Sequence, residues 1–171
     1  GGRLLPEFAG KLAVRRRVVG WFETESPKIL PVICADDDVG TFGMPAPRGL
    51  YKIGLHSIGG ATDPDNVREP DESDAALLSE YAAPLLPKHN PKPVRMQRCL
   101  YTVTPDENFL IAPSATHERV LMFSACSGHG FKYAPIFGEL AQEWLSGSPS
   151  QELTALMNPG LNVNRLGAPK T

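Results

Sequence analysis

The chain has 171 residues, which is enough for about one domain with a buried core. Its 17 basic and 19 acidic residues nearly balance, so charge gives no reason to expect nucleic acid or a membrane surface as a partner. No apolar run is long enough to cross a bilayer, and the first residues do not resemble a signal peptide. The cysteines, Cys34, Cys99 and Cys126, have the spacing of neither a disulfide framework nor a metal site. We therefore expect a reduced, cytoplasmic protein that binds no metal.

The first part of the chain predicts short strands joined by turns, and the 17 prolines, about twice the usual share, favour many turns. Residues 1–10 look like the end of a helix. We interpret the basic residues 15–17, at the start of the first strand, as a solvated rim. Asp36, Asp37 and Asp38 predict an exposed hairpin turn, because they lack the glycine and the alternating ligands of a calcium loop. The strands are expected at residues 15–23, 29–35 and 39–44.

Residues 49–60, GLYKIGLHSIGG, predict a strand with two different faces. Strict alternation places Tyr51, Ile53 and Leu55 on one face. The other face carries Lys52, Gly54 and His56: a cation, a gap that could admit the edge of a flat ring, and an imidazole. Taken alone, this pattern is more typical of an edge strand whose polar face meets water.

The middle of the chain predicts a helix and then a strand that carries a cysteine. Asp71 or Ser73 can cap a helix over residues 74–85, which Pro87 ends, and a proline-rich crossover follows at 88–93. In the next strand Cys99 shares a face with Gln97 and Tyr101, and these neighbours are more polar than those expected around a buried thiol. The alternative, a cysteine that acts as a small hydrophobic residue, stays open.

The last part of the chain predicts a strand, a tight loop and a helix. The apolar run 120–125 is typical of a strand covered on both faces, and it stops at the sequence SGHG, residues 127–130. Pro135 suits the first turn of a helix, and the helix is amphipathic up to Leu145. The glycines let the loop approach a ligand, the helix start attracts negative charge, and Lys132 adds a cation, although such a loop is often ordinary turn chemistry. A short helical turn is expected in the loosely packed tail, at 151–157.

The two halves of this region, CLYTVTPDENFLI and SACSGHGFKYAP, together resemble the C-terminal half of the monomeric sarcosine oxidase family, which includes N-methyltryptophan oxidase. The resemblance runs from about the first residues to Gly147. It implies FAD as cofactor, attached covalently through the sulfur of Cys99. It also implies that the glycine loop lies beside the flavin and that Lys132 binds the carboxylate of the substrate. The implied flavin-binding loop residues are Gly128, His129, Gly130 and Phe131.

The same resemblance extends to the GLYKIGLH stretch. It implies that Lys52 activates oxygen and that His56 belongs to the substrate site. A fixed cation suits the first role, because it stabilises the negative charge that oxygen gains, and it does so most strongly in a dry pocket. Phe42 stands where the family usually has a tyrosine near the substrate, so that hydroxyl is missing here.

The implied fold class is α+β. A mixed, mainly antiparallel sheet forms the substrate domain, and a strand, loop and helix form a piece of an FAD-binding domain. The G-x-G-x-x-G fingerprint of a dinucleotide-binding half occurs nowhere in the sequence. We therefore expect a fragment or subunit whose partner, in the same parent chain or in a separate chain, supplies that half. The expected divisions are residues 1–10, the end of an FAD-domain helix; 11–93, the substrate domain; 94–147, the return to the FAD-binding domain; and 148–171, a tail.

The function that the resemblance implies is an FAD-dependent oxidase of secondary amines such as N-methyl amino acids. The products would be an imine, which hydrolyses, and hydrogen peroxide formed from oxygen. One alternative is an amino-acid oxidase or dehydrogenase with a non-covalent flavin. The other is a non-catalytic domain fragment that, by itself, holds no flavin.

Overall fold

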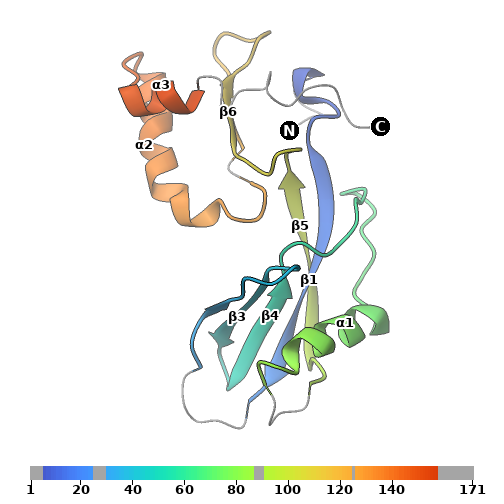
Figure 1. Cartoon of the computed structure of the whole chain (residues 1–171). Coiled ribbons are helices and arrows are strands. Elements are labelled where there is room, and N and C mark those ends of the chain that lie inside the picture. The colour runs from blue at the N-terminus through green and yellow to red at the C-terminus, as the bar shows by residue number, and fades with distance from the viewer. Residues whose placement is uncertain (1–5, 25–29, 87–90, 125, 158–171) are drawn as a thin grey trace. The chain divides into compact units, whose positions relative to one another are not determined.

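The computed structural model describes residues 6–24, 30–86, 91–124 and 126–157. The chain divides into two compact units. Unit 2 consists of Arg15–Leu100, and unit 1 combines Gly1–Val14 with Tyr101–Thr171. In unit 2 strands β1 to β4 precede helix α1, in unit 1 the α-helices follow strands β6 and β7, and the strands pair mainly in antiparallel fashion (Figure 1). The predicted α+β class with a mainly antiparallel sheet is therefore confirmed.

Unit 2 holds a five-stranded sheet in the order β2-β3-β4-β1-β5. Strand β2 pairs antiparallel with β3, β3 with β4, and β4 with β1. Most predicted strands are present with shifted ends, but the strand expected at 29–35 is reduced to two residues, and its first residue lies outside the described part. The strands are β1 (Ala13–Glu23), β2 (Ile33–Cys34), β3 (Thr41–Ala46), β4 (Leu50–Leu55) and β5 (Arg95–Val103).

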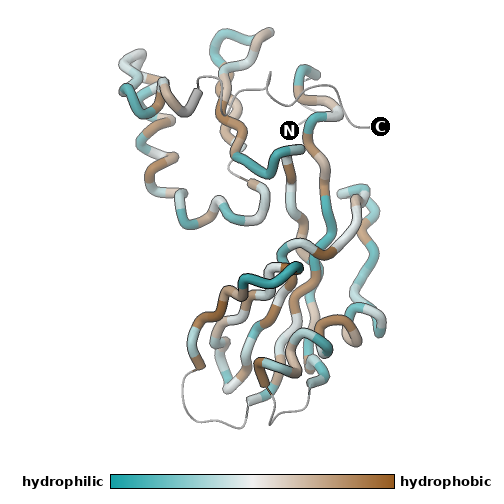
Figure 2. Tube along the Cα trace, in the orientation of Figure 1, coloured by the Kyte–Doolittle hydropathy of each residue, from teal (hydrophilic) through white to brown (hydrophobic). Residues whose placement is uncertain are grey.

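The core of unit 2 lies on the face of β4 that carries Tyr51, Ile53 and Leu55, as the alternation predicted. Phe22 from β1 and Leu78 from helix α1 (Glu72–Ala82) pack into the same cluster. Hydrophobic residues recur along these strands and along α1 in Figure 2. One face of the sheet is thus covered by α1, and the other face is left for the side chains that alternate with the core.

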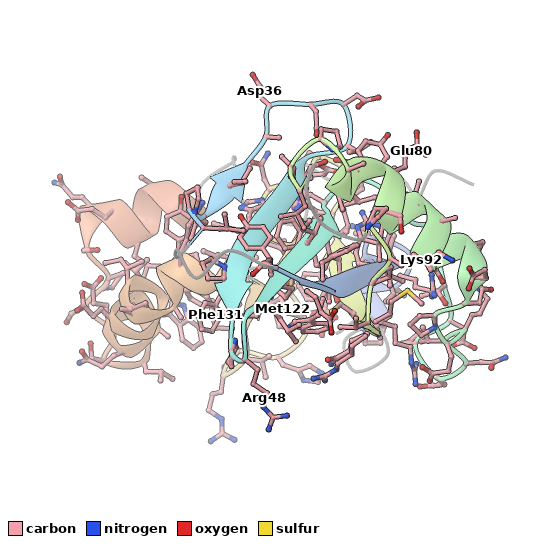
Figure 3. All side chains as sticks on the ribbon, turned by 90° about the horizontal axis from the view of Figure 1, so that it is seen from below. Asp36, Arg48, Glu80, Lys92, Met122 and Phe131 are labelled. Atoms are coloured by element: carbon pink, nitrogen blue, oxygen red, sulfur yellow. The ribbon has the colours of Figure 1, made fainter. Side chains whose placement is uncertain are left out.

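Helix α1 begins earlier and ends earlier than predicted, at Glu72 and Ala82. Asp71 is its N-cap: it accepts hydrogen bonds from the amides of Ser73 and Asp74, while the Asp74 carboxylate accepts one from the Asp71 amide. This capping box starts the helix ahead of the predicted first residue. Glu80 points away from the sheet on the outer side of α1 (Figure 3), and Pro87 lies outside the described residues.

The interpretation of residues 15–17 as a solvated rim is wrong for two of the arginines. Arg16 donates to both carboxylate oxygens of Asp74, over 2.9 and 2.7 Å, and so ties β1 to α1. Arg17 is only 5% exposed. An arginine in a strand can bury its stem and bind an acceptor on another element, and composition alone does not distinguish such a residue from a solvent-exposed charge.

The acidic turn between β2 and β3 is exposed, as expected for a hairpin, and Asp36 points outward from it (Figure 3). The Asp37 carboxylate accepts hydrogen bonds from the amides of Thr41 and Val39, over 2.8 and 3.3 Å. The turn thus uses a carboxylate to satisfy its own backbone. Within the described residues, no three His, Cys, Asp or Glu side chains gather as a metal site requires. Among the described helices, none is long and apolar enough to span a membrane.

Unit 1 contains a two-stranded antiparallel sheet and the C-terminal helices. Strand β6, which the sequence analysis did not predict, pairs its Leu110 with Ser124 of β7. Strand β7 is half-buried over most of its length rather than covered on both faces, since β6 is its only partner in the described part of unit 1. Its predicted end at residue 125 is outside the described residues. The elements are η1 (Pro6–Phe8), β6 (Leu110–Pro113), β7 (Leu121–Ser124), η2 (Phe131–Tyr133), α2 (Ala134–Leu145) and α3 (Gln151–Met157).

Two small hydrophobic clusters stabilise unit 1. Phe8 of η1 packs with Leu110 and Ala112, and on the other side of β6 Ile111 packs with Leu140 of α2 and Leu153 of α3. The helical turn predicted at 151–157 is thus confirmed as α3, and Leu153 anchors it. Pro135 lies in the first turn of α2, as predicted, whereas Leu145 at its end is 76% exposed instead of part of a buried stripe.

Candidate functional site

The sheet of unit 2 has a second face, opposite α1, that carries Lys52; we call it the Lys52 face. Because directly paired residues in adjacent strands point the same way, two cross-strand rows can be placed on it. Trp21, Lys52 and Met44 form one row. Val19, Gly54 and Phe42 form the next.

Lys52 is half-buried on this face, between the half-buried Trp21 and Met44. Half-burial of a lysine is typical of a methylene stem that lies along apolar neighbours while the ammonium stays at the polar end. The ion pairs found among the described residues do not involve Lys52. Among the described residues, therefore, no carboxylate forms an ion pair with this ammonium.

Gly54 does not leave the open gap that its small size suggested. A Cβ atom at position 54 would lie 2.4 Å from Cζ of Phe42 and 2.9 Å from Cγ1 of Val19. The phenyl ring of Phe42 therefore occupies the space over the glycine. This brings Phe42, a predicted substrate residue, next to the row that contains Lys52.

Cys99 lies on the Lys52 face as well. The Arg95 guanidinium sits over the Trp21 ring, 4.6 Å from its centroid, so Arg95 shares the face of Trp21 and Lys52. Alternation along β5 then puts Cys99, four residues further, on that face. The adjacent Arg98 supports this placement of Cys99, because its Nε lies 2.8 Å from a carboxylate oxygen of Glu69, on the opposite, α1 side of the sheet. The half-buried thiol of Cys99 is free.

His56 directly follows β4, and its backbone is fixed from both sides. Its amide donates to the carbonyl of Gly40 at 3.1 Å, and its carbonyl accepts from Nε of Arg17 at 2.6 Å. The bond to Gly40 continues the contact between the β3 and β4 segments one residue beyond the end of β4. Arg17 received no functional role in the sequence analysis, and its position in a run of basic residues gave no signal of one.

In unit 1 the glycine loop is bound to the end of β5. The Ser127 amide donates to the carbonyl of Thr102 at 2.8 Å, and the Ser127 hydroxyl lies 3.5 Å from the amide and the hydroxyl of Thr104. Ser127 and Gly128 both have positive φ, 56° and 81°, which gives the loop its tight reversal. The two motif pieces that suggested a site in the sequence are therefore physically joined.

The loop leads into the single turn η2, and α2 follows it with Pro135 in its first turn, as predicted. His129 packs against the ring of Phe109, with 4.7 Å between centroids, and its Nε2 is 3.0 Å from the Glu107 carbonyl oxygen. Phe131 is 95% exposed. The ammonium of Lys132 lies 5.3 Å from the centroid of the Tyr133 ring.

An aromatic cluster supports this loop, and the sequence analysis did not identify it. The Phe109 ring has edge contacts with Tyr133 and Phe137, at centroid distances of 5.5 and 5.3 Å, and Phe123 contacts Phe137 at 5.5 Å. Phe109 follows the acidic turn, where spacing alone gives no prediction of contact with α2. The cluster fixes the position of His129 and of the turn that carries Lys132.

The predicted site residues thus fall into two sets, each ordered within its own unit. In unit 2, Phe42, Lys52 and Cys99 share one face, and His56 lies at the end of the strand that carries Lys52. In unit 1, residues 128–132 form the loop and the turn that follows it.

Comparison with known proteins shows what these features are similar to. Residues 3–144 match the profile of a family described as FAD dependent oxidoreductase. The chain is 33% identical over 158 residues to monomeric sarcosine oxidase from Bacillus sp. (strain B-0618), covering 81% of this chain and 38% of that protein. It is 32% identical over 167 residues to N-methyl-L-tryptophan oxidase from Salmonella arizonae, covering 90% and 44%.

A solved structure of a fructosyl peptide oxidase has a similar fold, with a TM-score of 0.71 and 20% identity, covering 100% of this chain and 46% of that one. The chain spans less than half the length of the relatives it matches. Since the family profile extends over residues 3–144, the chain belongs to the family of FAD-dependent oxidoreductases.

Proposed function

We propose that the protein containing this chain is an FAD-dependent oxidase of secondary amines, with N-methyl amino acids as its substrate class. It would convert the amine to an imine and reduce oxygen to hydrogen peroxide. The observation that carries the proposal is the shared face of Cys99 and Lys52 on the sheet of unit 2. The names of the similar sarcosine and N-methyltryptophan oxidases support the same substrate class.

The side chains of the Lys52 face support this proposal, because they offer groups suited to holding FAD. Cys99 is a free thiol, so its sulfur is available for a thioether bond. Lys52 offers a half-buried ammonium without a carboxylate partner among the described residues. When bound, FAD accepts a hydride equivalent from the carbon next to the amine nitrogen and passes electrons to oxygen. Cys99 would hold the cofactor. For unit 1 taken by itself, Gly128 and Gly130 would let the loop backbone approach a flavin.

The remaining residues would bind and orient the substrate and stabilise charge. Lys52 would hold a fixed positive charge near oxygen, in surroundings where charge is screened less than in water. Lys132 is exposed on η2 and would bind the carboxylate of the amino acid. His56 would lie near the amine and exchange a proton with it. Phe42 has no hydroxyl, so it would present only an apolar ring to the substrate.

Two further expectations belong to this proposal. Because the chain spans 38% and 44% of the similar oxidases, a dinucleotide-binding half would be needed for activity, in the same polypeptide or as a separate chain. The thiols of Cys34, Cys99 and Cys126 are free, which supports a reducing compartment such as the cytoplasm.

The test is the intact mass and the absorption spectrum of the native protein, followed by peroxide release with sarcosine and other N-methyl amino acids. The proposal predicts a mass increased by one FAD, flavin absorption that survives acid precipitation, and peroxide from secondary amines. Flavin released by acid would instead indicate the non-covalent alternative. A native protein without flavin and without amine-dependent peroxide would contradict the proposal.

A further inference from the structure

Arg17 is a buried cation that donates hydrogen bonds to three backbone carbonyls. Its side chain is 5% exposed. Nε donates to the carbonyl of His56 at 2.6 Å, and Nη1 donates to the carbonyls of Gly59 and Arg16 at 2.9 and 3.2 Å. A buried guanidinium is tolerated when its N–H groups are satisfied, and hydrogen bonds from a charged donor are about twice as strong as neutral ones. The fork of Arg17 therefore fixes two carbonyls of the turn that follows β4.

The turn itself is pressed against β1. Gly59 has φ of +130°, and a Cβ atom there would lie 1.9 Å from the carbonyl oxygen of Arg16 and 2.9 Å from Nη1 of Arg17. The amide of Arg16 also donates to the carbonyl of Gly60 at 3.0 Å. The turn and β1 thus touch through backbone, so there is no space for a side chain at position 59.

His56 is held from the other side by the turn before β3. Its amide bonds to the carbonyl of Gly40, and the amide of Ser57 bonds to the carbonyl of Val39 at 2.9 Å. Gly40 has φ of +61°, and a Cβ atom there would lie 3.0 Å from Cβ of His56. The backbone of His56 is therefore defined at its amide, at its carbonyl and beside its Cβ atom. Of these three constraints, only the one at the carbonyl comes from a side chain.

We propose that Arg17 is a positioning residue that sets the direction of the His56 imidazole through the His56 carbonyl. The inference rests on the role of His56 proposed above, and it assigns Arg17 no contact with substrate or cofactor. Loss of the bond from Arg17 would allow the carbonyl carbon of His56 to shift, which would change the direction of its Cα–Cβ bond, and a displacement of about 1 Å in a substrate-positioning group can slow catalysis about 100-fold.

Arg16 is a matched control one residue earlier on β1. It is also an arginine held by several acceptors, but its guanidinium binds Asp74 and the carbonyls of Arg68 and Glu69. Loss of Arg16 should weaken the attachment of α1 without moving His56. Loss of Arg17 should move His56, so the two variants separate a local effect from a general loss of stability.

The experiment is NMR of the protein labelled with ¹⁵N-histidine, in which His56→Gln identifies the ring signals of His56. We expect Arg17→Gln to shift or broaden the His56 signals and to leave those of His117 and His129 unchanged, and Arg16→Gln to leave all of them unchanged. Arg17→Lys keeps the charge but cannot span both carbonyls, so it should also shift His56, and it serves if Arg17→Gln does not fold. Unchanged His56 signals in a folded Arg17 variant, or equal shifts in the Arg16 variant, would overturn the inference.

Kinetics on the flavin-containing protein provide the second measurement. Arg17→Gln should lower kcat/KM for the amine about 10- to 100-fold. In a His56→Gln background the same substitution should add less than about 2-fold, because coupled residues do not act additively. Additive losses would overturn the positioning role. If His56→Gln alone leaves kcat/KM unchanged, the proposed role of His56 fails, while the NMR result still decides whether Arg17 orients it.

Discussion

The amide of Ser127 donates a hydrogen bond of 2.8 Å to the carbonyl of Thr102, and this bond ties the glycine loop to the end of β5. Ser127 adopts a left-handed backbone conformation, with φ of 56°, and is 3% exposed. The loop is thus held by a buried residue in a conformation that residues other than glycine rarely adopt. Its shape depends on the contacts of Ser127 more than on the adjacent Gly128.

Two substitutions of Ser127 distinguish the contribution of its hydroxyl to stability from that of its backbone strain. Ser127→Ala and Ser127→Gly both remove the hydroxyl near Thr104, but only glycine relieves the left-handed conformation. We expect the alanine variant to be less stable than the glycine variant by about 1 kcal/mol. Urea unfolding of both variants measures the difference, and equal stability would show that strain at Ser127 contributes nothing.

The packing of Phe42 over Gly54 predicts a steric coupling on the Lys52 face. Gly54→Ala would place a Cβ atom 2.4 Å from Cζ of Phe42, so we expect a loss of about 2 kcal/mol in the free energy of unfolding. In a Phe42→Ala background the ring is gone, and the same substitution should cost less than about 0.5 kcal/mol.

Gly60→Ala is the control for this coupling, because nothing lies within 4 Å of a Cβ atom at that position. It should change stability by no more than about 0.5 kcal/mol. Chemical denaturation of the four variants gives the comparison. If Gly54→Ala costs the same with and without the Phe42 ring, another contact limits the space at Gly54.

The ion pair of Arg16 with Asp74 predicts a pH-dependent part of the stability. The hydrogen bonds from the Arg16 guanidinium lower the pKa of the Asp74 carboxyl below its ordinary value. The pair therefore stabilises the fold above the unfolded-state pKa of about 3.9, and this contribution disappears as pH falls through the lower folded-state pKa.

Asp74→Asn should lower the free energy of unfolding by about 2 kcal/mol at pH 7, because Asp74 bonds to a charged donor in a partly buried site. The difference from the parent protein should shrink as pH falls below about 4. Glu80→Gln, on the exposed side of α1, is the control and should have little effect at either pH. Urea titrations at several pH values test this, and a difference that stays constant down to pH 2 would contradict it.

Cys99 is predicted to attach the flavin. In the flavin-containing protein, Cys99→Ser should leave flavin that is released on acid precipitation, because a hydroxyl does not replace the thioether. Cys34→Ser is the matched control: Cys34 is also a free cysteine of unit 2, and its replacement should leave flavin attached. Absorption of pellet and supernatant decides between them. Flavin that stays in the pellet of Cys99→Ser would remove Cys99 from this role.

Lys52 is predicted to act on oxygen more than on the amine. In the flavin-containing protein, Lys52→Met should slow reoxidation by oxygen at least about tenfold more than reduction by substrate, since it removes a fixed charge in a poorly screened site. Arg95→Met removes a cation from the same face, stacked on Trp21, and should change neither rate. Stopped-flow measurements of the two half-reactions give the ratio. Equal slowing of both half-reactions would contradict the charge argument for Lys52.

Much of the local structure could be predicted because it depends on neighbouring residues. The alternation of Tyr51, Ile53 and Leu55 correctly identified the buried face of β4, and α3 has the predicted bounds. The predictions were wrong where a residue or strand distant in the sequence determines the contact. Arg16 looked like a solvated charge until Asp74, 58 residues away, was placed beside it. Strand β6 was missed because its short apolar run follows a turn and owes its pairing to β7.

The sequence by itself determined the elements, the glycine loop and the family resemblance, because spacing and residue type along one segment suffice for these. Only the tertiary structure decided which of them meet. Cys99 and Lys52 share a face because β1 lies between β4 and β5 in the sheet, and a shift of either outer strand by one residue would turn its side chain to the α1 side. The bonds from Arg17 to the carbonyls of His56 and Gly59 likewise join segments about 40 residues apart, at a range where local patterns carry no information.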